Sequence, residues 1–352
     1  MTNFLVSSLS LSSAPRSSVS RVQQDLVIAQ KEVVTGRFAD VGLSLGVSVG
    51  RTISMRSEMA GNEKLTSANT QLAQRFATMQ SALETTSQAG EGLLNSLISG
   101  GDRDASAKAN KNAANNNIGQ LVGALNSSFG SRYLFSGAKT NTPPMKVDAS
   151  NAPPELAAVK TAWQDFLGTL TPPDDPSIVT GADMEAFLKD DPSGPFEKFF
   201  TDANWTANWS DASDQQTQAR IGENETITSS ASANDKAFRD VMKAYVMTAS
   251  FDIDLLGSEA RQVLTSRAID TLSGGLSNIR ELRSEIGIGE ERIARTNEGL
   301  KSQKMVLKLA IGEEESVDVY EASTRVTNLM NTLETSYALT ARISRLSLLN
   351  YL

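Results

Sequence analysis

Residues 19–33 read VSRVQQDLVIAQKEV, and their pattern decides how the first part of this 352-residue chain folds. The apolar residues recur in alternating steps of three and four, which places them in one narrow row along a helix. That row consists of Val19, Val22, Leu26, Ala29 and Val33. A single helix cannot bury such a row by itself, so the segment needs a partner. We expect this helix to end at Gly36.

A second row of the same kind lies at the other end of the chain, in a last helix that we expect from about Ser316 to Leu349. Its apolar positions again follow helical spacing. They are Val326, Met330, Leu333, Tyr337, Ile343, Leu346 and Leu349. Each terminal segment is the obvious partner of the other, because neither can bury its row alone. The two ends are therefore predicted to pair as a coiled coil, with these two rows as its seam.

Helical periodicity continues inside the two ends. A long helix is expected from about Thr52 to the glycine pair Gly100–Gly101, which breaks it. The next helix is predicted to be capped by Asp102 or Asp104 and to stop around Gly130. It is rich in Ala and Asn and gains its apolar row only toward its end.

Three further segments complete the helical part. Residues 241–309 return to helical spacing, with an interruption near Gly257. Residues 40–50 alternate Val or Leu with Gly or Ser, which predicts a strand or extended loop with one apolar face. Gly312 and the acidic run Glu313–Glu315 are predicted to mark a boundary just before the last helix, because carboxylates favour the start of a helix.

The middle of the chain has a different composition. Nine of the ten prolines lie between residues 143 and 195, so this region cannot be one continuous helix. Residues 156–170 predict a short helix within it, and residues 220–230 predict a strand. We interpret the region as a small α+β insert.

These elements predict a mainly α fold. It is an elongated antiparallel helical bundle or coiled coil built from the N- and C-terminal segments, with a small inserted α+β domain. Residues 1–36 with 316–352 would form a terminal coiled-coil assembly domain. Residues 37–142 with 233–315 would form a rod of long helices, and residues 143–232 the variable insert.

Composition excludes several functions. The chain has no cysteine and no histidine, which removes thiolate chemistry, the Ser/His/Asp triad and histidine-containing zinc motifs. A net charge of -8 argues against a nucleic-acid partner. The first residues lack the pattern of a cleavable signal peptide, and no apolar run is long enough to cross a membrane. We expect no catalytic residues, no cofactor and no metal site.

Two motifs show a resemblance to a known family. Residues 131–137 read SRYLFSG and are followed by KTNTPP at 139–144, which resembles the segment that closes the first half of proteins of the flagellin superfamily. The last residues, 341–352, read ARISRLSLLNYL and resemble the C-terminus of the hook–filament junction members of that superfamily. The resemblance covers residues 1–142 and 233–352. Tyr133, Leu134, Phe135 and Gly137 would then mark the junction between the helices and the insert.

The resemblance implies a structural role. Such a subunit would join hook to filament in the bacterial flagellum and transmit torque, without enzymatic activity. Its partners would be neighbouring copies of itself, the hook-side junction protein (hook-associated protein 1), flagellin, and the flagellar export chaperone and secretion apparatus. Nucleic acid and membrane would not be partners. The protein would be secreted to the extracellular flagellum without a cleaved signal peptide.

Two alternatives remain open at this point. A filament flagellin would share the helical ends and differ chiefly in its terminal sequence and stoichiometry. A secreted enzyme carried on flagellin-like ends would need paired carboxylates in the insert, because the chain has no histidine. The insert offers Asp174, Asp175, Asp190 and Asp191 for that role.

Overall fold

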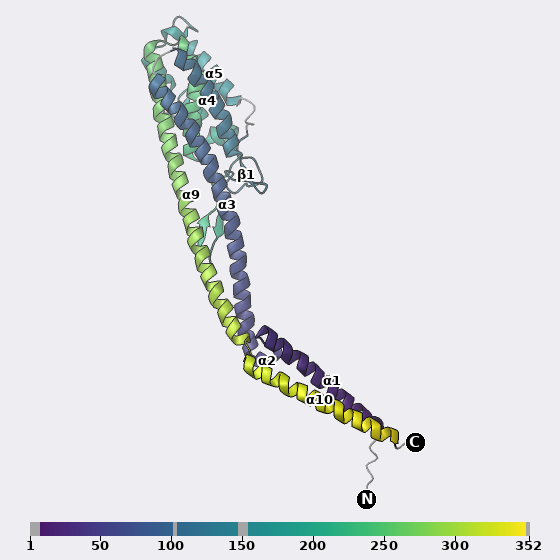
Figure 1. Ribbon diagram of the computed structural model, residues 1–352. Coiled ribbons are helices and arrows are strands. Elements are labelled where there is room, and N and C mark those ends of the chain that lie inside the picture. The colour runs from purple at the N-terminus through teal and green to yellow at the C-terminus, as the bar shows by residue number, and fades with distance from the viewer. Residues whose placement is uncertain (1–7, 101–103, 147–153, 350–352) are drawn as a thin grey trace. The chain divides into compact units, whose positions relative to one another are not determined.

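The computed structural model describes residues 8–100, 104–146 and 154–349, most of which are helical (Figure 1). Contacts divide the chain into two compact units. Unit 1 contains residues 1–64 and 299–352, and unit 2 contains residues 65–298. The predicted fold class, mainly α with a small α+β insertion, is confirmed.

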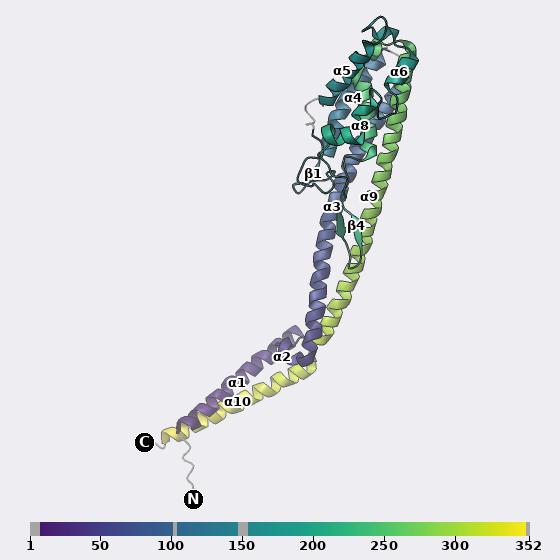
Figure 2. The same ribbon diagram turned by 180° about the vertical axis from the view of Figure 1, so that it is seen from behind.

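Unit 1 contains two long terminal helices and the ends of two others. Its elements are α1 (Ser8–Thr35), α2 (Val41–Leu45), the 3-10 turn η1 (Gly46–Ser48), α10 (Val319–Leu349), the first part of α3 (Val49–Gly100) and the last part of α9 (Ser258–Glu315). Helices α1 and α10 lie side by side in both views (Figures 1 and 2). They run antiparallel, because Glu32 contacts Arg325 whereas Gln23 contacts Tyr337. The predicted pairing of the two chain ends is confirmed.

Helix α1 ends where the sequence predicts. Its last residue is Thr35, and Gly36 follows in the left-handed region with φ of +67°. Glycine takes this conformation at little cost, so it terminates the helix. The carbonyl of Glu32 accepts a hydrogen bond from the Gly36 amide at 2.8 Å, which closes the last turn.

The prediction of a strand or extended loop at residues 40–50 was wrong. The segment forms α2, η1 and the start of α3. Asp40 caps α2, and its carboxylate accepts a hydrogen bond from the Leu43 amide at 3.0 Å. A strand needs a neighbour for its backbone groups, and no strand pairs with this segment among the described residues, whereas a helix satisfies its own groups. The alternating apolar residues do not form a buried face either, because the side chains of Leu43 and Val47 are 84% and 101% exposed.

The prediction that Gly312 and the acidic run mark a boundary just before the last helix was also wrong. Glu313–Glu315 form the final turn of α9, and α10 begins only at Val319. Carboxylates are unfavourable at a helix C-terminus. Arginine side chains from α3 offset this cost, because Arg51 pairs with Glu314 and Arg56 with Glu315.

Unit 2 is built on the remaining parts of α3 and α9, which run antiparallel along each other. Asn69 bonds Asn297 at 2.9 Å near one end, and Glu91 pairs with Arg280 further along. Two contacts need glycine: a Cβ on Gly90 would lie 2.7 Å from Leu276, and one on Gly289 would lie 2.7 Å from the Phe76 ring. The close approach of these helices is therefore fixed by glycine facing large apolar residues.

Helix α4 (Asp104–Leu125) and helix α8 (Lys236–Ser250) pack together in unit 2. Helix α4 ends at Leu125, earlier than the predicted stop around Gly130, because a hairpin of β1 (Ser128–Phe129) and β2 (Arg132–Tyr133) follows at once. Gly130 and Ser131 both have positive φ, the conformation that a tight hairpin turn requires. Asp102 lies outside the described residues, as does the side chain of Asp104.

The insert contains short elements packed through aromatic rings. They are α5 (Pro154–Leu167), η2 (Pro176–Ile178), α6 (Gly181–Phe187), η3 (Glu197–Phe199), α7 (Asp202–Asn204), the π-helical turn η4 (Trp205–Trp209), β3 (Gln218–Arg220) and β4 (Thr226–Thr228). The ring centroid of Trp163 lies 5.0 Å from that of Phe187 and 5.1 Å from that of Phe251, which precedes the 3-10 turn η5 (Ile253–Leu255). The first contact lies within the insert, and the second joins the insert to the end of α8 (Lys236–Ser250), which Phe251 follows.

The strand predicted over residues 220–230 is wrong in extent, because this range holds the end of β3, a turn and β4. β3 and β4 form an antiparallel hairpin, and the Ile221 amide donates to the Glu225 carbonyl at 2.9 Å across the turn. Gly222 and Asn224 lie in this turn, where such residues are favoured. The Glu225 carboxylate accepts hydrogen bonds from Arg292 and Thr296 of α9, which hold the hairpin in place.

Candidate assembly interface

The predicted row on α1 is the least exposed face of that helix. Ala29 is buried, and Val19, Val22, Leu26 and Val33 are half-buried, whereas the intervening residues are mostly exposed. The helical period brings these five side chains to one line facing α10.

The facing row on α10 includes some of the predicted residues and leaves others at its edge. Its less exposed positions follow steps of three and four and are Ala322, Val326, Leu329, Leu333, Ser336 and Thr340. Met330 and Tyr337 are 48% and 49% exposed and flank this row. The side chains of Ile343, Leu346 and Leu349 lie outside the described residues. Ala322 and Leu329 were missed in the sequence, because several apolar residues of this helix fit a heptad spacing equally well.

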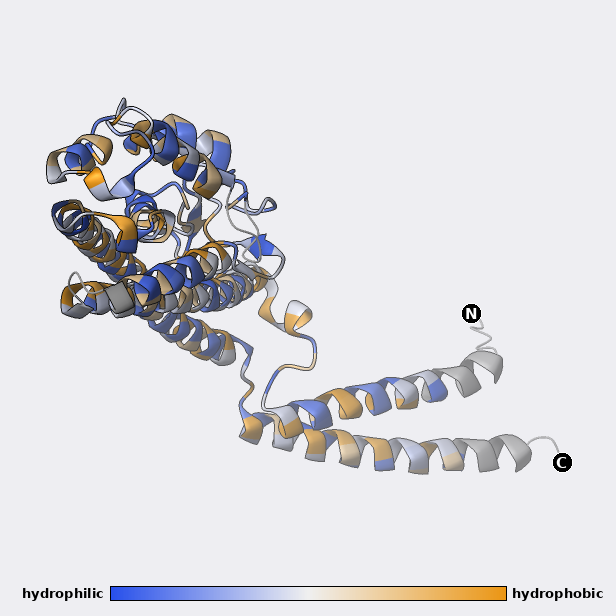
Figure 3. Ribbon diagram, turned by 90° about the horizontal axis from the view of Figure 1, so that it is seen from above, coloured by the Kyte–Doolittle hydropathy of each residue, from blue (hydrophilic) through white to orange (hydrophobic). Residues whose placement is uncertain are grey.

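The terminal pair, defined as α1 and α10, leaves much of its apolar surface open. Only Ala29 and Ala322 are fully buried among the apolar residues whose side chains are described in these two helices. Hydrophobic residues recur along both helices when the chain is viewed from above (Figure 3). The pairing of two helices therefore buries the seam only in part.

Exposed apolar residues are concentrated in unit 1. Among the described residues, all but three of the large hydrophobic side chains that are strongly exposed belong to it; the exceptions are Ile98, Leu255 and Ile288. The unit 1 group includes Val27 and Val34 on α1, Ile53 on α3, and Met305, Val306 and Leu309 on α9. Exposed apolar side chains gathered in one unit are typical of a protein that associates with others.

A cluster of charges lies where the terminal pair meets α3 and α9 within unit 1. Glu315 is 1% exposed, and its carboxylate accepts two hydrogen bonds from the Arg56 Nη2 atom, at 2.6 and 2.8 Å. Glu32 is 3% exposed and accepts a hydrogen bond from the Arg325 Nη1 atom at 3.0 Å. Arg37 lies 3.7 Å from Glu315. Sequence reasoning missed this cluster, because its partners are as far as 293 positions apart.

The segment predicted as the junction with the insert, Tyr133–Gly137, is held in unit 2 by buried side chains and backbone hydrogen bonds. Leu134 and Phe135 are buried, Tyr133 is half-buried, and the Phe135 ring lies 5.6 Å from that of Phe238. The Gly137 amide donates to the Ala231 carbonyl at 2.9 Å, and the Phe135 carbonyl accepts from the Ala233 amide at 2.7 Å.

These bonds form a bridge between residues 136 and 232, so the chain entering the insert lies beside the chain leaving it. Gly137 has a φ of +60°, and a Cβ there would lie 2.1 Å from the Ser213 carbonyl oxygen. Gly137 therefore joins three stretches of chain at a point where no side chain fits.

The aspartates of the insert are engaged in local structure. Asp175 and Asp191 accept hydrogen bonds from Ser177 and Ser193, and these bonds lower the pKa of each aspartate. Asp174 lies in a turn with a φ of +63°. A general acid needs a raised pKa, so the shifts of Asp175 and Asp191 run against that role.

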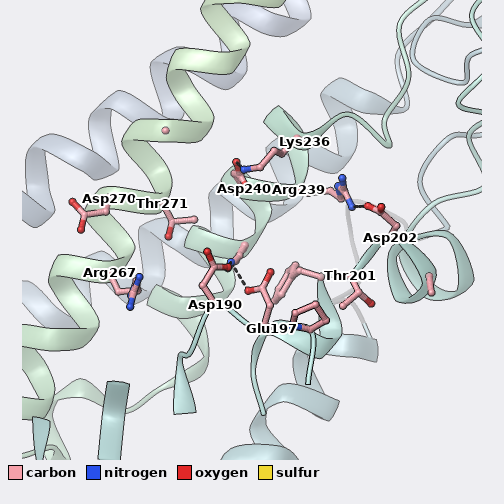
Figure 4. A pocket seen from close by; sticks show the side chains of 15 residues that line it. Asp190, Glu197, Thr201, Asp202, Lys236, Arg239, Asp240, Arg267, Asp270 and Thr271 are labelled. Carbon is pink, nitrogen blue, oxygen red and sulfur yellow. Dashed lines mark hydrogen bonds and ion pairs between the residues drawn. The ribbon is translucent and has the colours of Figure 1, made fainter. Parts of the chain in front are cut away.

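Asp190 lines a pocket of about 740 Å³ in unit 2 (Figure 4). It pairs with the Lys243 ammonium at 3.2 Å, and Lys243 also pairs with Glu197. Burial raises the pKa of Glu197, while the hydrogen bond from Lys243 opposes the rise. Because Lys243 contacts both carboxylates, the arrangement fastens the loop at residues 190–197 to α8.

Two kinds of site are absent from the part of the chain that the structure describes. No group of three or more carboxylates there is arranged to hold a metal ion. No described helix combines the length and the apolar character that crossing a membrane requires.

Comparison with known proteins gives two matching family models. The model of the bacterial flagellin N-terminal helical region matches residues 6–140, and that of the bacterial flagellin C-terminal helical region matches residues 269–352. Together they cover more than half of the chain, including all of α1 and α10. No curated protein sequence matches the chain at a significant level.

Two solved structures are similar to this chain. A putative flagellar hook-associated protein from Vibrio parahaemolyticus has 10% sequence identity and a TM-score of 0.52, covering 76% of this chain and 97% of its own. Bacillus cereus FlgL has 11% identity and a TM-score of 0.38, covering 75% and 97%. At this identity the first likeness concerns the fold alone. The matches at both ends, in chain order, establish that the chain belongs to the bacterial flagellin family and is a structural protein of the flagellum.

Proposed function

We propose that this protein is the subunit that joins hook to filament at the hook–filament junction and carries torque between them. The proposal is supported by the family and by residues 341–352, whose sequence resembles the C-terminus of junction members. Copies of the subunit would form a short ring. The terminal pairs would pack inward as a tube, with the long helices in the next layer.

The concentration of exposed apolar side chains in unit 1 carries the assembly part of the proposal. Burying apolar surface stabilises an association by about 25 cal/mol for each Å². A protein that works as a soluble monomer gains no stability from exposing the apolar side chains of unit 1. Neighbouring copies that cover Val27, Val34 and Met330 would bury apolar surface that the pairing of α1 with α10 leaves exposed.

The partners and the location belong to the same proposal. The partners are neighbouring copies, the hook-side junction protein, flagellin, and the export chaperone and secretion apparatus. The protein would act in the extracellular flagellum and would have no enzymatic activity. The absence of enzymatic activity is supported by the hydrogen bonds and the ion pair that occupy Asp175, Asp191 and Asp190 of the insert.

We also propose the three-part division: 1–36 with 316–352 for assembly, 37–142 with 233–315 as the rod, and 143–232 as the insert. The bridge between residues 136 and 232 supports the insert's limits, since it closes both of its ends. The Tyr133–Gly137 segment then acts as the junction between rod and insert.

A deletion strain tests the function. Loss of the gene should leave cells with hooks but without filaments, and flagellin should accumulate in the medium. Normal filaments in that strain contradict the proposal. The second candidate, a filament flagellin, is favoured by the flagellin models themselves. Immunogold labelling separates the two, because a junction subunit is stained only at the filament base and a flagellin along its length.

A further inference from the structure

Arg75 lies on α3 and has no neutralising partner among the described residues. The residue is half-buried, and two of its guanidinium nitrogens, Nε and Nη2, are buried without a hydrogen-bond partner. A buried charge is costly unless an opposite charge or hydrogen bonds compensate it. Arg280 and Arg292 of the same unit are compensated in this way, by Glu91 and Glu225. Arg75 therefore lacks an anion.

A second arginine lies near Arg75. Arg132 belongs to β2, in the hairpin that lies beside α3 in both views (Figures 1 and 2). Burial and the charge of Arg132 lower the pKa of Arg75, so the two guanidinium groups are close enough to repel each other. Arg132 is exposed and forms no ion pair within the part of the chain that the structure describes. Two like charges held close together favour an anion that both can bind.

The two segments that carry these arginines contain no carboxylate of their own. Residues 64–83 and 105–146 include lysines and arginines but no Asp or Glu, although the chain has 41 acidic residues and a net charge of -8. Lysines of the second segment are paired with carboxylates from elsewhere in unit 2, Lys111 with Asp252 and Lys146 with Asp211. The two arginines are not paired in this way, so a compensating anion has to come from outside these segments.

We propose that Arg75 and Arg132 form a binding site for an oxyanion, a group such as phosphate or carboxylate. The Nε and Nη2 atoms lie on one edge of the guanidinium group, and such an edge binds an oxyanion through two parallel hydrogen bonds. The Arg75 side chain is long, flexible and half-exposed, so a change of its rotamer can bring this edge to the surface beside Arg132.

An oxyanion held by both arginines would join two parts of unit 2. Arg75 belongs to the long helix α3, whereas Arg132 directly precedes the junction segment Tyr133–Gly137. The bound group would remove the repulsion between the arginines and tie the hairpin to α3. A ligand that binds only the folded state stabilises it, so unit 2 should become more stable. The site goes beyond the proposed function and does not depend on it.

Thermal unfolding of the full-length chain tests the site, with inorganic phosphate as the probe. All three tryptophans lie in unit 2, so their fluorescence reports the unfolding of that unit. Phosphate is compared with chloride at equal ionic strength, because general screening by salt is then the same. Once phosphate exceeds its dissociation constant several-fold, the Tm of the parent should lie about 2–4 °C above its value in chloride.

The variants are Arg75→Gln and Arg132→Gln, and both should remove the rise in Tm with phosphate. Arg295→Gln is the matched control and should keep the rise, since Arg295 is exposed on α9 and pairs with Glu291 of the same helix. In chloride, Arg75→Gln should unfold at or above the Tm of the parent, because it removes a buried charge that has no partner. Where Arg75→Gln alters the fold, the exposed Arg132 still tests the site.

The same rise in the parent and in both site variants overturns the assignment, as does the absence of a rise in the parent or its loss in the control. A free oxyanion and a carboxylate of another copy share this chemistry, and protein concentration distinguishes them. A Tm that rises with protein concentration in chloride, and no longer does so in Arg75→Gln, identifies a carboxylate of another copy. A Tm that is independent of protein concentration identifies a free oxyanion as the ligand.

Discussion

At the scale of single residues, Gly137 offers the sharpest test of the junction with the insert. Its φ of +60° disfavours any side chain, and a Cβ would collide with the Ser213 carbonyl. Gly137→Ala should therefore lower the free energy of unfolding by about 3 kcal/mol or more. Gly130→Ala is the control, since its φ of +56° is similar but its Cβ would meet nothing within 4 Å. The control should cost only about 1 kcal/mol, and equal losses in urea titrations would contradict the steric argument.

The Thr180 cap of α6 gives a second residue-scale prediction, about pH. Hydrogen bonds from the Thr180 hydroxyl and amide lower the pKa of Asp183. The folded-state pKa thus lies below the unfolded one, so the cap stabilises the fold above the ordinary carboxyl range and loses this effect as pH falls through the folded value. Thr180→Ala should raise the pKa of Asp183 toward its usual value. Carbon-13 titration of the carboxyl group checks the shift, and an unchanged pKa would show that the hydroxyl is not its cause.

At the scale of elements, the close packing of α3 and α9 in unit 2 depends on Gly289. Its Cβ would lie 2.7 Å from the buried Phe76 ring, which has no space to move away. Gly289→Ala should destabilise the fold by about 1–3 kcal/mol through overpacking. Gly287→Ala on the same helix meets only Gln80 at 3.8 Å, and should instead stabilise the helix by about 0.5–1 kcal/mol. Thermal unfolding of the two variants distinguishes them by the sign of the change.

The elements also show what the sequence could predict. Long helices with one apolar row, such as α1 and α10, were found because helical spacing sustained over many residues is incompatible with a strand or a loop. Residues 40–50 were predicted wrongly because alternation of apolar and small residues fits a strand, while the Asp40 cap that favours a helix is a single residue. The charge cluster around Glu315 was not predictable, since Arg56 and Glu315 are 259 positions apart and only the antiparallel pairing brings them together.

At the scale of the whole molecule, the apolar surface of the terminal pair should serve contacts between copies. Met330 is half-exposed at the edge of the α1–α10 seam, whereas Leu333 lies within it. Met330→Asp should therefore leave the free subunit folded but abolish filament retention, because a charge placed between packed copies is costly. Leu333→Asp should weaken the terminal pair itself and lower its helix content.

Asn328→Asp is the matched control, because Asn328 is an exposed polar residue on the same helix and the variant adds the same charge. Circular dichroism of the free subunit and motility of the complemented deletion strain are the two measurements. Met330→Asp should leave the helix content normal and abolish motility. Asn328→Asp should leave both helix content and motility normal. If Met330→Asp cells swim normally, neighbouring copies do not bury the outer face of α10, and the exposed apolar residues of this helix do not serve assembly.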